Sequence, residues 1–237
     1  MNAMVNKNNF DFKEFIQNSR DVLLNPKEFY SRFELTGGIV QPLIKALIYG
    51  AVAGLFLMIW SIVHFGGVSG GILGSAVGIS AFFLTIVGAL IGAFIMGVVL
   101  LVLSSICGGN TDYEANFRVG VSIMVIYPIS AFLGFLGGIS FLLGALVGLT
   151  INLYALYILY LGLSIALKGK EQSAKVTSYV LGGLLLLFTL IGIGTRHAAR
   201  TYLDFGINQI EYNLKSRESV AENTQKSASI DFLDMVE

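Results

Sequence analysis

Two long stretches without a charged residue are the feature that most limits what this chain can fold into. No Asp, Glu, Lys or Arg occurs from Ala46 to Thr111 or from Val119 to Leu167. A charged side chain at the centre of a bilayer costs about 2.5 to 3.5 kcal/mol, whereas Leu, Ile, Phe and Val favour insertion. Charged residues make up only 13% of the chain, and a soluble domain needs about 25% to cover its surface. The sequence therefore predicts an all-α, polytopic transmembrane helical bundle.

The lengths of the uncharged runs predict about five spans within a membrane domain of residues 43–195. A straight helix crosses about 30 Å of hydrocarbon with about 20 apolar residues. Residues 66–80 are glycine-rich and are expected to form an external loop, either alone or with a short half-buried helix. The spans are expected at residues 43–65, 81–106, 117–136, 139–167 and 176–193.

Proline and glycine predict where the later spans bend or end. Pro128 should kink the third span, because proline lacks the N–H group that an α-helix uses. Gly137-Gly138 is expected to form the hairpin between the third and fourth spans. The fourth span exceeds the bilayer thickness, so it must tilt, bend or begin as a short separate helix near Gly144 and Gly148.

The positions of lysine and arginine predict that the N-terminus is cytoplasmic. In this orientation the cytoplasmic loops carry the cations, and the two external loops carry no charge. Arg196 and Arg200 are exceptions, because they follow the last span and would be external. The cytoplasmic cations near the spans are Lys27, Arg32, Lys45, Arg118, Lys168, Lys170 and Lys175.

Amphipathic segments flank the membrane domain on both sides. Residues 1–42 form a cytoplasmic arm whose aromatic and charged residues predict short amphipathic helices. These helices are expected either to lie in the membrane interface or to cap the cytoplasmic end of the bundle. Phe29, Tyr30 and Phe33 are the candidate contacts for a partner. Residues 196–237 are expected to begin as an interfacial amphipathic helix and to end as a disordered tail.

The residue types give no sign of a catalytic centre, a cofactor site or a metal site. The two histidines, His64 and His197, have no cysteine or acidic neighbour at metal-ligand spacing. No predicted span contains an acidic residue, which argues against a proton- or cation-coupled transporter. The formal net charge of zero provides no basic footprint for nucleic acid. The expected partners are the lipid bilayer and either another membrane protein or further copies of this chain.

Small and polar residues recur at helical spacing within the spans. Many of the 28 glycines are four residues apart, which lets helix backbones approach closely, within one chain or between copies. Five polar residues of the fourth span fall on one side of a helix at 100° per residue. Hydroxyl groups in hydrocarbon need partners, so this polar stripe is expected to make interhelical hydrogen bonds or to line a cavity. The stripe consists of Thr150, Tyr154, Tyr157, Tyr160 and Ser164.

Several short motifs follow one another along residues 22–193. They are Asn25-Pro26-Lys27-Glu28-Phe29-Tyr30, Gly108-Gly109-Asn110-Thr111-Asp112-Tyr113-Glu114-Ala115-Asn116-Phe117-Arg118, Asn152-Leu153-Tyr154-Ala155-Leu156-Tyr157, Gly162-Leu163-Ser164 and Ser173-Ala174-Lys175. In this order the motifs resemble the Yip1 family. The resemblance implies five spans, a cytoplasmic N-terminus and no enzymatic activity.

Within the family that the chain resembles, eukaryotic members act in Golgi and ER vesicle trafficking and bind Rab GTPases, while prokaryotic relatives have no settled role. This chain lacks the Asp-Leu-Tyr-Gly-Pro motif of the eukaryotic N-terminal region, and its arm is short. This difference argues against GTPase binding. It favours a prokaryotic relative in the inner cell membrane.

The sequence supports a leading function and one alternative. The leading hypothesis is a non-enzymatic membrane scaffold or adaptor with a role in membrane organisation or trafficking, because no paired titratable groups are present. The alternative is a small transporter, channel or lipid-moving protein that uses a cavity beside the fourth span. A membrane-embedded enzyme would need two convergent acidic, basic or metal-ligating groups, and the sequence indicates none.

Overall fold

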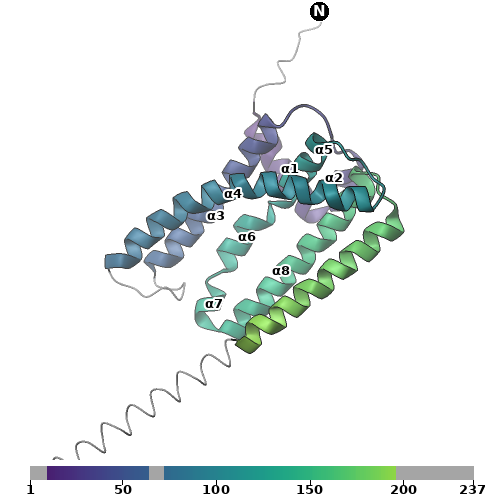
Figure 1. Cartoon of the computed structure of the whole chain (residues 1–237). Helices are drawn as coiled ribbons and strands as arrows, with labels where there is room; N and C mark the ends of the chain where they lie inside the picture. The colour runs from purple at the N-terminus through teal and green to yellow at the C-terminus, as the bar shows by residue number, and fades with distance from the viewer. Residues whose placement is uncertain (1–9, 64–71, 196–237) are drawn as a thin grey trace, which may run out of the picture. The chain divides into compact units, whose positions relative to one another are not determined.

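The computed structural model describes residues 10–63 and 72–195, and every regular element in that part of the chain is helical. The predicted tail at residues 196–237 lies outside the described residues. The chain divides into two compact units, Met1–Leu187 and Phe188–Glu237. The described part of the second unit is the end of the last helix. The described residues contain five helices that are long and apolar enough to cross a membrane, so the predicted all-α fold is confirmed. These helices are Val40–Ile62, Gly78–Ile106, Tyr113–Ile139, Phe141–Ala166 and Glu171–Thr195 (Figure 1).

The arm folds into two short helices, α1 (Phe12–Leu24) and α2 (Pro26–Ser31). Asp11 starts α1, because its carboxylate accepts hydrogen bonds from the backbone N–H groups of Lys13 at 2.8 Å and Glu14 at 3.2 Å. Proline suits the first position of α2, where its fixed φ matches a helix and its missing N–H is not needed.

The second candidate span begins earlier than the sequence predicts. The expectation of an external loop over residues 66–80 is wrong for residues 72–80, which form the first turns of α4 (Ile72–Ile106), and the remainder lies outside the described residues. In Figure 1, α4 runs beside α3 (Val40–Ile62). A Cβ atom on Gly78 would lie 3.2 Å from Oγ of Ser61, so the two helices are close there. This packing stabilises a helix that glycine alone would disfavour.

The third candidate span is broken where proline predicts a kink. Its parts are α5 (Tyr113–Ile123), α6 (Ile126–Leu133) and α7 (Leu136–Ile139). Pro128 cannot donate to the carbonyl of Met124, and its ring would clash with that group. The backbone N–H of Tyr127 donates to the Met124 carbonyl instead, at 2.9 Å, and closes a tighter turn. The predicted kink is therefore confirmed.

The turn into the fourth candidate span lies at Ser140, so the predicted hairpin at Gly137-Gly138 is wrong. Both glycines are part of α7, and Ser140 has extended backbone with φ −150°. A Cβ atom on Gly144 would lie 2.5 Å from Cα of Gly137, so the glycines let α7 pack closely against α8 (Phe141–Leu161). Their small size serves this contact and not the reversal of the chain.

α8 runs without a break through Gly144 and Gly148, which excludes the predicted alternative of a separate first helix. It continues into one turn of π-helix, η1 (Gly162–Ala166), in which the N–H of Leu167 donates to the carbonyl of Gly162 at 2.9 Å. The last helix, Glu171–Thr195, follows after a short loop.

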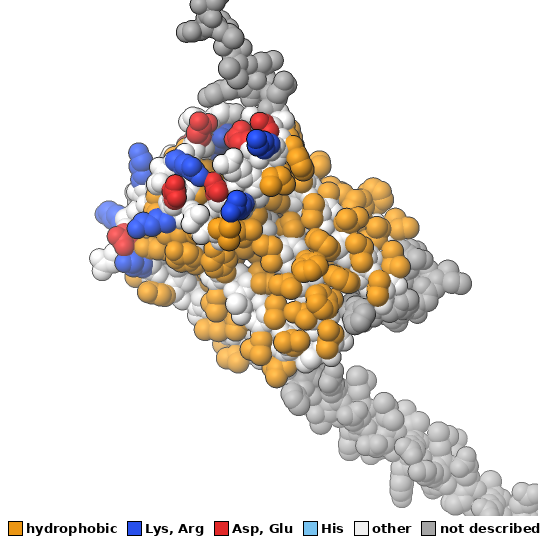
Figure 2. Space-filling view, turned by 180° about the vertical axis from the view of Figure 1, so that it is seen from behind, with side chains coloured by type: hydrophobic (Ala, Val, Ile, Leu, Met, Phe, Trp, Pro, Cys, Tyr) orange, Lys and Arg blue, Asp and Glu red, His pale blue; other side chains and the backbone are white. Residues whose placement is uncertain are grey.

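The buried core lies at the end of the bundle that carries the charged residues. Residues 115–126 are buried except for the partly buried Arg118. Half of the most apolar window of the third candidate span is buried, against 11% in the fourth and 0% in the last. Figure 2 shows charged side chains gathered at one end and apolar side chains over the rest of that face. Such an apolar exterior fits contact with lipid and not with water.

Candidate functional site

The N-terminal arm is packed onto the charged end of the bundle. Phe15 and Val22 of α1 and Phe29 and Tyr30 of α2 each have 6% or less of their surface exposed and belong to the main core. Between the two expectations for the arm, this burial favours the cap over helices that only lie in the interface. The rings of Phe29 and Tyr30 are buried in the core and help to hold the arm in place, and their role as partner contacts stays a prediction.

Three hydrogen bonds join the two helices of the arm to three different spans. The Tyr30 hydroxyl lies 2.8 Å from Oγ of Ser122 in α5. Ser122 donates its own proton to the carbonyl of Val119 at 2.7 Å, so Tyr30 is the donor to Ser122. Burial raises the pKa of Tyr30, which keeps its hydroxyl protonated and able to donate.

In the other two hydrogen bonds a tyrosine hydroxyl is again the donor. Ser19 donates to the carbonyl of Phe15, so the Tyr49 hydroxyl of α3 donates to Oγ of Ser19 at 2.7 Å. The Tyr154 hydroxyl of α8 donates to the backbone carbonyl of Leu23 at 2.5 Å. A tyrosine ring packs against apolar neighbours, and its hydroxyl group makes a hydrogen bond. Three tyrosines therefore fix both helices of the arm to the bundle.

Arg118 fixes the connector between α2 and α3. Its guanidinium donates from Nε to the carbonyl of Glu34 and from Nη1 to the carbonyl of Gly38, both at 2.9 Å. The N–H of Gly38 donates to the Glu114 carboxylate at 2.6 Å. Gly37 has φ +123°, a conformation that L side chains rarely adopt, and a Cβ there would lie 3.3 Å from Arg118 Nη1. The sequence motif around Arg118 resembled a family signature, but its contact with the connector was not predicted.

Two loops at the same end are joined through their backbones. The N–H of Asn110 donates to the carbonyl of Leu167 at 2.7 Å, and the N–H of Lys170 donates to the carbonyl of Cys107 at 2.8 Å. The buried amide of Asn116 donates to the carbonyl of Asn110 at 2.9 Å. These bonds anchor the first turn of the last helix to the loop that precedes α5.

The exposed side of the arm is apolar. Phe12, Ile16 and Leu24 have 60%, 52% and 62% of their surface exposed. At 100° per residue they fall within one third of the circumference of α1, together with the exposed side chains of Lys13 and Arg20. Phe33, the third aromatic predicted as a partner contact, is partly buried against the core. Of the two helices of the arm, α1 thus carries the accessible apolar surface, and the aromatics of α2 face inward.

The predicted polar stripe of the fourth candidate span divides into three groups. Thr150 and Ser164 donate to carbonyls one turn earlier in their own helix, those of Leu146 at 2.9 Å and Tyr160 at 2.8 Å. Tyr154 reaches the arm. Tyr157 and Tyr160 instead line a groove between α8 and the last helix.

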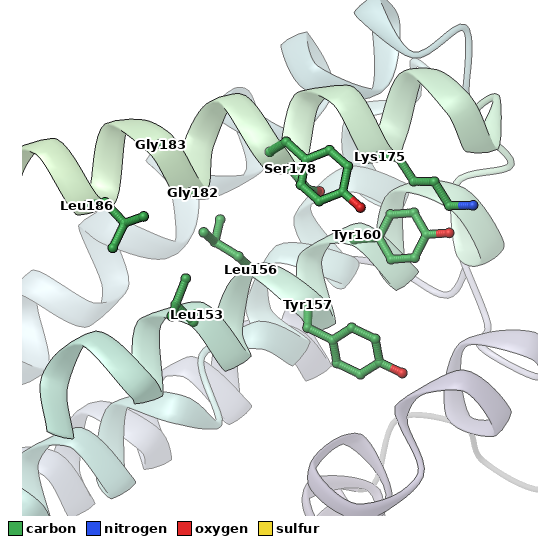
Figure 3. A pocket seen from close by; sticks show the side chains of 10 residues that line it. Leu153, Leu156, Tyr157, Tyr160, Lys175, Ser178, Gly182, Gly183 and Leu186 are labelled. Carbon is green, nitrogen blue, oxygen red and sulfur yellow. The ribbon is translucent and has the colours of Figure 1, made fainter. Parts of the chain in front are cut away.

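This groove has a volume of about 570 Å³ and is lined mainly by apolar atoms. Figure 3 shows Tyr160 and Lys175 at one end and Leu153 and Leu186 towards the other. The Lys175 ammonium lies 2.7 Å from the Glu171 carboxylate, and Tyr160 donates to the same carboxylate at 3.3 Å. Oγ of Ser178 is buried on the groove wall and has no hydrogen-bond partner among the described residues.

Within the part of the chain that the structure describes, no three His, Cys, Asp or Glu residues are grouped so that they could hold a metal ion.

A family model described as the Yip1 domain matches residues 20–193. The match begins within α1 and ends near the end of the last helix. It includes all the motifs that carry the resemblance. No curated protein and no solved structure matches this chain. The family match supports a multi-pass integral membrane protein in contact with the lipid bilayer, and it does not favour the alternative of a small transporter, channel or lipid-moving protein.

Proposed function

The chain belongs to the Yip1 family, and on that premise we propose that it is a non-enzymatic membrane scaffold or adaptor that presents its N-terminal arm to a second protein. One observation carries this proposal. The arm is fixed to the bundle on one side by buried rings and hydrogen bonds, and on its other side it exposes Phe12, Ile16 and Leu24. A surface that is already ordered before binding costs less conformational entropy when a partner docks.

The composition of this surface suits a protein partner. Large apolar side chains supply the area that is buried, and Lys13 and Arg20, exposed on the same face, supply positive charges. A membrane protein that carries an apolar patch with acidic residues around it has the complementary chemistry.

We place the charged end of the bundle, and with it the arm, in the cytoplasm of a prokaryotic cell. The support is the concentration of Lys and Arg at this end (Figure 2) and the absence of charge from residues 119–167, which include the turn at Ser140. A cysteine placed at Lys170 in a Cys107→Ser background should be shielded from a membrane-impermeant maleimide in intact cells. Labelling without permeabilisation would contradict the orientation.

Site-specific photo-crosslinking in the cell tests the arm. A photoreactive amino acid at Ile16 should give an adduct of discrete mass with one second protein. The matched control places the same group at Glu14, which is exposed on α1 but, at 100° per residue, lies outside the third of the circumference that holds the apolar face. An adduct at twice the mass of the chain would identify the partner as a second copy.

Two outcomes would count against the arm as the docking element. One is crosslinking at Ile16 to lipid alone, which would place α1 in the membrane interface. The other is an equal yield of protein adduct at Ile16 and Glu14, which would show that the apolar face has no special role.

A further inference from the structure

The groove between α8 and the last helix lies in a part of the chain that should be surrounded by hydrocarbon. Its volume of about 570 Å³ is within the range of about 300 to 1,000 Å³ that is typical of sites for small molecules. Water is a poor occupant, because a buried water molecule needs two or more polar partners and the middle of the groove has apolar walls. An apolar molecule is the occupant that this environment favours.

We propose that the groove holds one acyl chain of an anionic phospholipid, with the phosphate of that lipid at Lys175. The lipid is a bound component of the protein in this proposal, and no transport is implied. The site is separate from the apolar face of α1, so it stands or fails independently of the docking role of the arm.

Two adjacent glycines create the space for the acyl chain. A Cβ atom on Gly183 would meet no described atom within 4 Å, and one on Gly182 would lie 3.7 Å from Cδ1 of Leu156. Any large side chain at these positions would fill the groove. The glycines therefore do not bring the two helices into contact, as Gly50 and Gly54 do for α3 and α4, but leave a channel between them.

The length of the groove matches one leaflet. Lys175 and Leu186 mark its two ends (Figure 3). Eleven helical steps of about 1.5 Å separate these residues, or about 16 Å, and half of a hydrocarbon core of about 30 Å is about 15 Å. A chain that starts at a headgroup beside Lys175 would thus reach the bilayer centre near Leu186.

The polar end of the groove is complementary to an anionic headgroup. Lys175 has three donor hydrogens and only Glu171 as an ion-pair partner among the described residues, so it can also donate to a phosphate oxygen. Lys168 and Lys170 in the preceding loop add positive charge.

Native mass spectrometry of the full-length protein tests the site. The protein is purified in detergent that contains equal amounts of phosphatidylglycerol and phosphatidylcholine, and the lipids that remain bound are counted. The wild type should retain phosphatidylglycerol preferentially. Gly183→Leu should retain severalfold less of it, because the leucine side chain occupies the groove, whereas the matched control Gly192→Leu on the same helix should retain as much as the wild type.

A second pair of variants separates the chain from the headgroup and guards against misfolding. Leu156→Trp fills the groove from α8 and should reproduce the loss. Lys175→Gln should leave lipid bound but abolish the preference for phosphatidylglycerol.

The proposal is overturned if Gly183→Leu and Leu156→Trp both retain as much phosphatidylglycerol as the control, or if the wild type has no preference between the two lipids. It is also overturned if the groove-filling variants convert a dimer into a monomer without changing the bound lipid. In that case a helix of a second copy occupies the groove.

Discussion

The third candidate span and the last helix are similarly apolar but are packed in opposite ways. Half of the most apolar window of Tyr113–Ile139 is buried inside the chain, and none of that of Glu171–Thr195 is. The third span is surrounded by other helices and receives the arm, whereas the last helix is joined at its start by loop hydrogen bonds and then runs along a groove. Hydrocarbon solvates apolar side chains as well as a protein core does, so close packing, and not apolarity, decides where stability resides.

Truncating a ring in each region should give the largest contrast. Phe117 is fully buried in α5 and stacks near Phe94 with ring centroids 5.2 Å apart. Phe117→Ala should lower the free energy of unfolding by about 3 kcal/mol, because the cavity it leaves cannot be filled by lipid. The matched control Phe188→Ala removes a ring that is 69% exposed on the last helix and should cost less than about 1 kcal/mol.

Thermal unfolding of the purified variants in one detergent measures both effects. Equal losses for the two variants would mean that the core at the charged end is not better packed than the outer surface.

The sequence was sufficient for the features that depend on solvation and local backbone chemistry. The uncharged runs predicted five spans and an all-α fold, and Pro128 predicted the break before it. The features it missed depend on packing between distant segments. Because residues 66–80 are glycine-rich, a loop was predicted there. Nothing in the sequence shows that Gly78 packs on Ser61 of the preceding helix.

The candidate site was predicted less completely for the same reason. Helical periodicity placed Tyr154, Tyr157 and Tyr160 on one face, but it could not show that Tyr154 bonds to Leu23, 131 residues away. The two faces of an amphipathic arm were equally consistent with a membrane surface and with the bundle. Only the positions of partners such as Ser122 distinguish these arrangements, and those partners are ordinary small residues with no recognisable pattern.

Adding one methyl group should have effects of opposite sign at a closely packed glycine of α3 and at an open glycine of the last helix. A Cβ on Gly50 of α3 would lie 2.6 Å from Cβ of Ala89 in α4, so Gly50→Ala should force the helices apart and cost about 2 kcal/mol. Gly183→Ala adds its methyl group to open space and should stabilise the last helix by about 0.5 kcal/mol, because alanine loses less backbone entropy on folding. Unfolding in denaturant measures both values.

This pair of variants also tests whether the groove is open at Gly183. If Gly183→Ala is as destabilising as Gly50→Ala, the last helix is packed against another protein surface at that point, and the contrast between the two regions fails.

The smallest of the three effects concerns the bond between the arm and α5. Tyr30→Phe removes the hydroxyl that donates to Ser122 but keeps the ring, so the arm should lose about 1 kcal/mol of docking free energy. The measurement is the rate of trypsin cleavage after Lys27 in the purified protein, which should rise severalfold. Tyr179→Phe is the control, since that side chain is 77% exposed on the last helix, and it should not change the rate.

The same bond predicts how docking depends on pH. Burial raises the pKa of Tyr30 above the ordinary tyrosine value, which is about 10. The docked arm therefore holds the proton more tightly than the released arm, so this contribution to docking is complete below about pH 10 and is lost as the pH rises further. Tyrosinate absorbance, taken as the difference between the wild type and Tyr30→Phe, should show one group that ionises above the ordinary tyrosine pKa. If that group ionises at the ordinary value of about 10, the arm is not held by a buried contact, and the charged end of the bundle is as open as the last helix.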